Sequence, residues 1–143
     1  MDIQKIAQLP TDVMELVSES ELEGYRLVRR LVDEYVSGEN CFSSLGEALF
    51  SVRDNGKLVG IGGVNIQSGD DPSVGRIRHV YISKSARGLG AGKKLISTIE
   101  AHSCNYFTSL VLFTSFEDAI KFYESLGYVA VSLPKISHRK VIS

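Results

Sequence analysis

Three glycines at alternate positions, Gly88, Gly90 and Gly92, constrain this chain more than any other stretch. They follow an apolar run and precede a helical pattern. Glycine has no Cβ, so the backbone there turns tightly and approaches a ligand closely. A helix that begins at such a turn directs unpaired N–H groups and the positive end of its dipole outward. The stretch therefore predicts a strand, a phosphate-binding loop and a helix, with Arg87 adding a positive charge.

The patterns around this loop predict one α/β (α+β) domain. Strands are expected at 13–17, 48–52, 58–66, 75–83, 109–113, 128–131 and 139–142. Helices are expected at 22–37, 92–102 and 116–126, loops at 1–11 and 67–73, and a loop or a short second helix at 38–47. Their order predicts a mixed, mostly antiparallel sheet of six to seven strands with helices on both faces. The domain spans residues 1–143, with its core from about 12 to 142.

Local details refine two of the strands. Asn55 and Gly56 predict a tight hairpin turn, because both residues tolerate positive φ. The glycines of 58–66 indicate a bulge or another backbone lying close. Strict alternation in 75–83 predicts two faces, which are occupied by Arg76, Arg78, Val80 and Ile82 on one side and by Ile77, His79 and Tyr81 on the other.

Composition excludes several functional classes. Sixteen basic and seventeen acidic residues give a net charge of −1, so nucleic acid is not an expected partner. The chain has no apolar run of about 18 residues and no secretory signal pattern at its start, so we expect a cytoplasmic protein that does not cross a membrane. Cys41 and Cys104 lie far apart without a CxxC pair, so neither a disulfide framework nor a metal site is expected.

Two well-known phosphate-binding fingerprints do not match the glycine stretch. In the nucleotide P-loop, Arg87 stands where the first glycine belongs and Lys94 where the magnesium-binding hydroxyl belongs. In the dinucleotide fingerprint, Lys93 occupies the place of the third glycine. What remains is an Arg-x-x-Gly-x-Gly pattern between a strand and a helix.

This pattern resembles the pyrophosphate-binding motif of the GNAT N-acetyltransferase superfamily. The stretch from Ala119 through Phe122 and Tyr123 to Tyr128 is similar to the Ala-x-x-Phe-Tyr-x-x-x-Gly-Phe signature of that family. The resemblance covers about residues 20–142 and extends to the last strand. One position departs from the family pattern, because Phe116 stands where many relatives carry an asparagine that contacts the cofactor.

The resemblance implies acetyl-CoA as co-substrate and assigns it a set of contacts. The implied cofactor-binding residues are Val80, Tyr81, Ile82, Arg87, Gly88, Leu89, Gly90, Ala91, Gly92, Lys93, Phe122 and Tyr123. Val80 and Ile82 would pair through their backbones with the pantetheine arm. Tyr123 is the implied general acid for the leaving thiolate. No metal is implied.

The general base and the acceptor are left open by the sequence. His79 has a suitable unperturbed pKa for a base, while Glu47 and a water relay are alternatives. Arg76 and Arg78 either line an acceptor site for an amine with an acidic group or form a solvated basic face. The predicted function is acetyl transfer to a primary amine of a small molecule or protein, by a monomer or homodimer. An acyl-CoA-binding sensor without turnover is the alternative.

Overall fold

The computed structural model describes residues 1–67, 69 and 71–143. The described residues form seven strands, four α-helices and one short 3₁₀ helix. In chain order these are β1 Asp2–Ile6, α1 Val13–Leu22, α2 Leu27–Ser37, β2 Ala48–Asp54, β3 Lys57–Ile66, β4 Val74–Ile82, η1 Lys84–Ala86, α3 Ala91–Ser103, β5 Ser109–Leu112, α4 Glu117–Ser125, β6 Val129–Leu133 and β7 Ile136–Val141.

The strands form one sheet in the order β1-β2-β3-β4-β5-β7-β6. Neighbouring strands are antiparallel except for β4 and β5, which run parallel. The parallel pair requires a crossover, and α3 supplies it. The predicted mixed, mostly antiparallel sheet with helices on both faces is confirmed.

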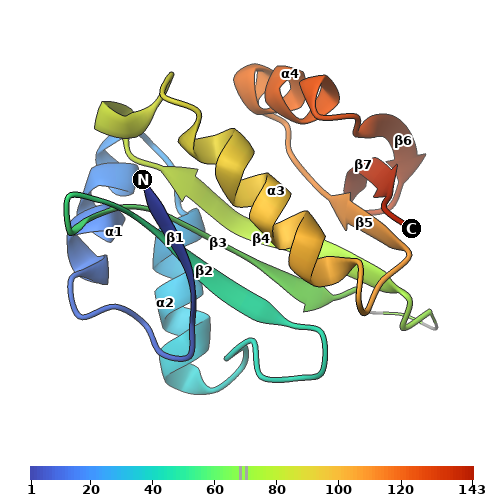
Figure 1. Cartoon of the computed structure of the whole chain (residues 1–143), viewed down its shortest axis with the longest axis horizontal. Coiled ribbons are helices and arrows are strands. Elements are labelled where there is room, and N and C mark those ends of the chain that lie inside the picture. Colours follow the sequence, from blue (N-terminus) through green and yellow to red (C-terminus); the bar gives the residue numbers. More distant parts are fainter. Residues whose placement is uncertain (68, 70) are drawn as a thin grey trace.

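Helices cover both faces of the sheet (Figure 1). On one face α1 and α2 pack against β3 and β4, and the apolar core between them includes Val17, Leu31 and Ile61. On the other face α3 crosses the four strands β1–β4. The second core joins α3 to the sheet and to α4, so β4 lies between two cores.

The N-terminal part differs from the sequence prediction. Residues 1–11 include the edge strand β1, which pairs with β2 and has a weak pattern because only one neighbour and one face constrain an edge strand. Residues 13–17 are helical, not a strand. Val13, Leu16, Val17 and Ser20 are buried at helical spacing along α1, a period that a window of five residues cannot distinguish from a strand.

The helix predicted over 22–37 begins only at Leu27, after a break at Gly24, where φ is +86°. Its end is confirmed, since Gly38 caps α2 with φ of +83°. The Asn55–Gly56 hairpin is also confirmed, with φ of +50° and +82°. Of the loop predicted over 67–73, Ser68 and Asp70 lie outside the described residues.

Candidate active site

The site is organised by a bulge in β4. Gly63 pairs with Arg78 and Ile61 pairs with Tyr81, so Gly62 faces two residues of β4 instead of one. His79 absorbs the extra length with φ of +60°, which is uncommon for a side chain other than glycine. A Cβ on Gly62 would lie 2.9 Å from Cγ2 of Val80, so glycine allows the two strands to stay close there.

The bulge corrects the predicted faces of β4. Arg78 contacts Glu34 of α2, and His79 lies beside the same carboxylate, so two consecutive side chains share one face. Tyr81 follows them on that face. Ile77 instead belongs to the α3 core, as do the partly buried side chains of Val80 and Ile82. Alternation correctly kept Val80 with Ile82 and His79 with Tyr81, but it joined each pair to the wrong side of the bulge, because a local pattern does not register an extra residue in one strand.

Among the described residues, no strand pairs with β4 on the β5 side beyond Arg76. Only Val74, Gly75 and Arg76 pair with β5, and β5 ends at Leu112. The stretch from Ile77 to Ile82, which contains the bulge, therefore presents an unpaired strand edge on the side where β5 has ended. An extended, amide-containing ligand can pair with such an edge as an added strand would.

The glycine loop follows this open edge after the short 3₁₀ helix η1. Gly88 and Gly90 have φ of +77° and +83°, and Gly90 is the N-cap of α3. Within the described chain, the N–H groups of residues 88–93 make no hydrogen bond to a backbone carbonyl. Because these donors cluster at a helix N-terminus, the loop fits an anion such as a pyrophosphate.

Gly92 brings this loop against α4. A Cβ at Gly92 would lie 3.2 Å from the ring of Phe122, so the absence of a side chain permits the close approach. The neighbouring Tyr123 is buried and its ring lies 5.5 Å from that of Tyr128. The structure thus brings the two sequence motifs together at the end of β4 and the start of α3.

The Tyr123 hydroxyl makes no hydrogen bond with the described residues, and burial alone raises its pKa. The phenol is therefore protonated at neutral pH and has its proton free to donate. Phe116 is half-exposed at the N-cap of α4. Its ring meets that of Tyr25 edge-on at 5.0 Å, so it packs against the α1–α2 connection.

The charge of Arg87 is paired with the carboxylate of Glu23. Its guanidinium donates to both carboxylate oxygens of Glu23, and its Nε donates to the carbonyl of Ile82 at 3.0 Å. It also lies over the Tyr81 ring. The side chain therefore holds the start of the loop in place, and the anion-binding donors are the backbone N–H groups that follow.

His79 is buried beside Glu34. Its Nε2 lies 3.4 Å from Oε1 of Glu34, and neither atom has a hydrogen-bond partner among the described residues. Burial lowers the pKa of His79, the charge of Arg78 lowers it further, and Glu34 offsets part of this effect. The imidazole is therefore neutral near pH 7. Glu34, but not His79, lines a cleft of about 370 Å³ next to α2.

Glu47, the other candidate base, is held by structural contacts. Its carboxylate accepts hydrogen bonds from the backbone N–H groups of Ser44 and Ile66 and from the side-chain amide of Asn65. Asn65 in turn exchanges two hydrogen bonds with Asn40. This network closes the loop before β2 onto the end of β3, and it leaves Glu47 less available than Glu34 for proton transfer.

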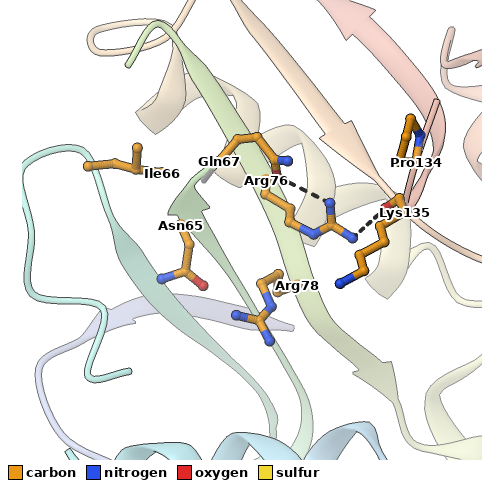
Figure 2. A pocket seen from close by; sticks show the side chains of 7 residues that line it. All are labelled: Asn65, Ile66, Gln67, Arg76, Arg78, Pro134 and Lys135. Atoms are coloured by element: carbon orange, nitrogen blue, oxygen red, sulfur yellow. Dashed lines mark hydrogen bonds between the residues drawn. The ribbon is translucent and has the colours of Figure 1, made fainter. Parts of the chain in front are cut away.

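Arg76 and Arg78 line a cleft of about 420 Å³ together with Lys135 from the β6–β7 turn (Figure 2). Sequence inspection misses Lys135 and Glu34, because the turn and α2 are distant from β4 along the chain. A charged residue on the polar face of an amphipathic helix, such as Glu34, was the only available indication. Within the described part of the chain, no group of three His, Cys, Asp or Glu side chains is placed to hold a metal.

Comparisons with known proteins agree with this geometry. The family model of the acetyltransferase (GNAT) domain matches residues 46–130. A structure from Exiguobacterium sp. 255-15, assigned as an acetyltransferase, is 32% identical with a TM-score of 0.88, over 99% of this chain and 94% of the other. None of the described helices is long and apolar enough to cross a membrane.

More distant structures share the fold. A GNAT-family acetyltransferase from Staphylococcus aureus Mu50 is 16% identical with a TM-score of 0.75, over 99% of this chain and 100% of the other. An aminoglycoside 6'-N-acetyltransferase solved with coenzyme A is 18% identical with a TM-score of 0.74, over 100% and 98% of the two chains. Among curated proteins, none matches this sequence.

Proposed function

Because the chain belongs to the GNAT acetyltransferase family, we propose that it transfers an acetyl group from acetyl-CoA to a primary amine of a small molecule or protein. The observation that carries the proposal is the continuity of two features. The open edge of β4 at residues 77–82 is followed, after η1, by a row of N–H groups at the start of α3 that have no backbone partner among the described residues.

These features fit the two halves of an acyl-CoA molecule. The edge at Val80–Ile82 is suited to the amides of a pantetheine arm, and the loop from Arg87 to Lys93 is suited to a pyrophosphate. Leu89 and Ala91 contribute through their backbone, since the Leu89 side chain is exposed and that of Ala91 is buried in the core. Bound acetyl-CoA supplies the thioester whose carbonyl carbon the amine attacks.

The residues around the bulge have distinct roles in the transfer. Backbone N–H groups at the splayed part of β4 stabilise negative charge on the carbonyl oxygen. The hydroxyl of Tyr123 donates its proton to the thiolate sulfur as the C–S bond breaks. The proton lost by the amine nitrogen as the N–C bond forms passes to Glu34, with the neutral His79 directly behind it.

The Glu34–His79 pair suits the task of a base better than either residue alone. Oε1 of Glu34 has no hydrogen-bond partner among the described residues, and the side chain lines the cleft beside Arg78. If the imidazole takes up a proton, the carboxylate 3.4 Å away compensates its positive charge, so no unpaired charge is buried. Without the carboxylate, the buried imidazole would be harder to protonate, because burial disfavours its charged form.

Binding and turnover are tested separately. Acetyl-CoA at a hundredfold excess over its Kd is expected to stabilise the protein by about 2.7 kcal/mol in a thermal-unfolding experiment. A thiol-release assay with amino acids, polyamines, aminoglycosides and peptides then identifies the acceptor class. Stabilisation by ATP but not by CoA overturns the proposal. Binding of acetyl-CoA without turnover on any amine supports a sensor instead.

A further inference from the structure

A polar groove runs along the face of the sheet that α2 covers. The cleft of about 420 Å³ beside Lys135 and an adjoining cleft of about 370 Å³ share three lining residues, Asn65, Ile66 and Arg78. The groove therefore extends from the β6–β7 turn to the loop after α2. Together these volumes suit a small molecule.

One end of the groove is positively charged. Arg76, Arg78 and Lys135 line it, and none of the seven lining residues of this cleft is acidic. Arg76 donates to the side-chain oxygen of Gln67 and to the carbonyl of Lys135, both neutral acceptors. Figure 2 shows these two hydrogen bonds and the Lys135 side chain on the same side as Arg78.

The charges of these cations are poorly compensated. Burial lowers the pKa of Arg76, and the charge of Arg78 lowers it further. Arg78 has a single contact to Glu34 at 3.3 Å, and the ammonium of Lys135 has no ion-pair partner among the described residues. A partly buried guanidinium without an anionic partner is costly, so an anionic ligand would be favoured there.

The other end of the groove is negatively charged. Glu34, Glu39 and Glu47 line the adjoining cleft. Glu34 lies next to His79 at the β4 bulge, where the proposed transfer takes place. The groove thus has Arg76 and Lys135 at one end and carboxylates at the other, with Arg78 paired to Glu34 where the two clefts meet.

We propose that the acceptor is a small amine that also carries a carboxylate, with its carboxylate bound by Arg76, Arg78 and Lys135 and its amine directed toward Glu34. This assignment rests on the acetyltransferase function proposed above. Arg76 and Arg78 supply planar guanidinium donors suited to the two oxygens of a carboxylate. Lys135 adds a charge from a turn where it has φ of +59° and where its carbonyl is held by Arg76.

The test compares amines that differ only in the carboxylate. Acetylation of β-alanine, γ-aminobutyrate and L-lysine is measured against their carboxamides at saturating acetyl-CoA. We expect at least one amino acid to exceed its amide roughly tenfold or more in kcat/KM, since loss of a charged hydrogen-bond partner costs about one to two powers of ten. Equal or better turnover of the amides in every pair overturns the inference while leaving acetyl transfer intact.

Variants identify the groove as the origin of that preference. Lys135→Asn removes the charge and keeps a residue that tolerates positive φ, and we expect it to raise KM for the amino acid about tenfold without changing the amide. Lys135→Glu is expected to raise it further. Lys57→Asn is the matched control, because Lys57 starts β3 at the far end from Ile66, about 30 Å away.

A binding experiment separates the two proposals. Thermal unfolding is measured with CoA and each amino acid together, which requires no turnover. Stabilisation by an amino acid that Lys135→Asn abolishes supports the groove even if no amine is acetylated, an outcome that would defeat only the transfer. Absence of stabilisation by every amino acid, or equal stabilisation of the Lys135→Asn variant, overturns the inference.

Discussion

The guanidinium of Arg87 donates to both carboxylate oxygens of Glu23, at 2.7 and 2.6 Å. The pair joins the α1–α2 connection to the start of the glycine loop. Hydrogen bonds from Arg87 and Tyr81 lower the pKa of Glu23. Glu23 therefore neutralises the charge of Arg87, the residue that begins the proposed pyrophosphate-binding loop. Its carboxylate also accepts a hydrogen bond from the hydroxyl of Tyr81.

Removing the charge of Glu23 should strengthen cofactor binding. We expect Glu23→Gln to lower the Kd for acetyl-CoA about threefold at low salt, because Arg87 then faces the pyrophosphate without a competing carboxylate, and we expect the gain to shrink as salt rises. Titration calorimetry at two salt concentrations measures it. Glu21→Gln is the control, because it removes an equal charge that pairs with Arg29 instead. Weaker binding by Glu23→Gln would mean that the pair shapes the loop.

Tyr123→Phe should reduce chemistry and spare folding. The hydroxyl has no hydrogen bond to lose in the described structure, so stability is expected to change little, while kcat falls roughly a hundredfold through loss of the proton donor. The KM for acetyl-CoA should stay within about twofold. Steady-state kinetics with a thermal-unfolding measurement checks all three quantities. An unchanged kcat would remove Tyr123 from the proposed mechanism.

Tyr128→Phe is the matched control for that experiment and carries the opposite expectation. The hydroxyl of Tyr128 donates to Glu100 at 2.7 Å, and that carboxylate keeps its second partner, Lys140. Loss of the hydrogen bond should lower the free energy of unfolding by about 1 kcal/mol. Since this hydroxyl bonds to Glu100 of α3 and has no part in the proposed transfer, kcat should remain near that of the parent protein.

Substitution of Gly90 should test the glycine loop. Gly90 has φ of +83° with open space where a Cβ would lie, so Gly90→Ala introduces backbone strain and no clash. We expect a loss of about 1 kcal/mol of stability and weaker acetyl-CoA binding, because the strained loop redirects its N–H groups. Gly90→Asn should be milder, since asparagine tolerates this conformation. Equal Kd values for all three proteins would show that the loop does not hold the cofactor.

Stability should fall on mild acidification because of His79. The unfolded chain takes up a proton near pH 6.5, whereas burial and Arg78 keep the pKa of the folded residue lower. Between these pKa values the unfolded state binds more protons, so the free energy of unfolding decreases as pH falls below about 7. This loss reverses on return to neutral pH.

The variant His79→Asn isolates that effect, because asparagine accepts the φ of +60° and does not titrate. Urea unfolding is compared at about pH 7.5 and about pH 5.5. The variant is expected to be less stable overall but to lose less stability between the two pH values. The carboxylates with lowered pKa, such as Asp12, act at lower pH and are common to both proteins. Parallel losses would exclude His79 as the source.

Features governed by neighbouring residues were predictable from the sequence. The Asn55–Gly56 turn and the Gly38 cap depend on the φ that those residues adopt, which is a local property. The strand β5 was predicted from a continuous apolar run typical of a buried strand, and the helix α3 from its helical spacing of apolar residues. The prediction failed at α1 and β1, where a short window or a single edge pairing left the pattern ambiguous.

The candidate site divides in the same way. The glycine loop and the Phe122–Tyr123 pair stand out as motifs, and their proximity through Gly92 follows from the fold. The faces of β4 were wrong, because an extra residue in one strand is visible only against its partner. Glu34 and Lys135 reach the groove from elements that are remote along the chain, and no local pattern specifies such a meeting.

The sequence by itself therefore determined the family, the sheet-and-helix architecture and the phosphate-binding character of residues 87–93, since these depend on backbone freedom, periodicity and a motif. Only the tertiary structure decided that Arg87 is paired with Glu23, that β4 separates from β5 after Arg76, and that Arg76, Arg78 and Lys135 share one groove with Glu34. The physical reason is the separation along the chain over which each effect acts. Turn and helix preferences act over a few residues, whereas charge pairing and burial join side chains that only the packed chain brings together.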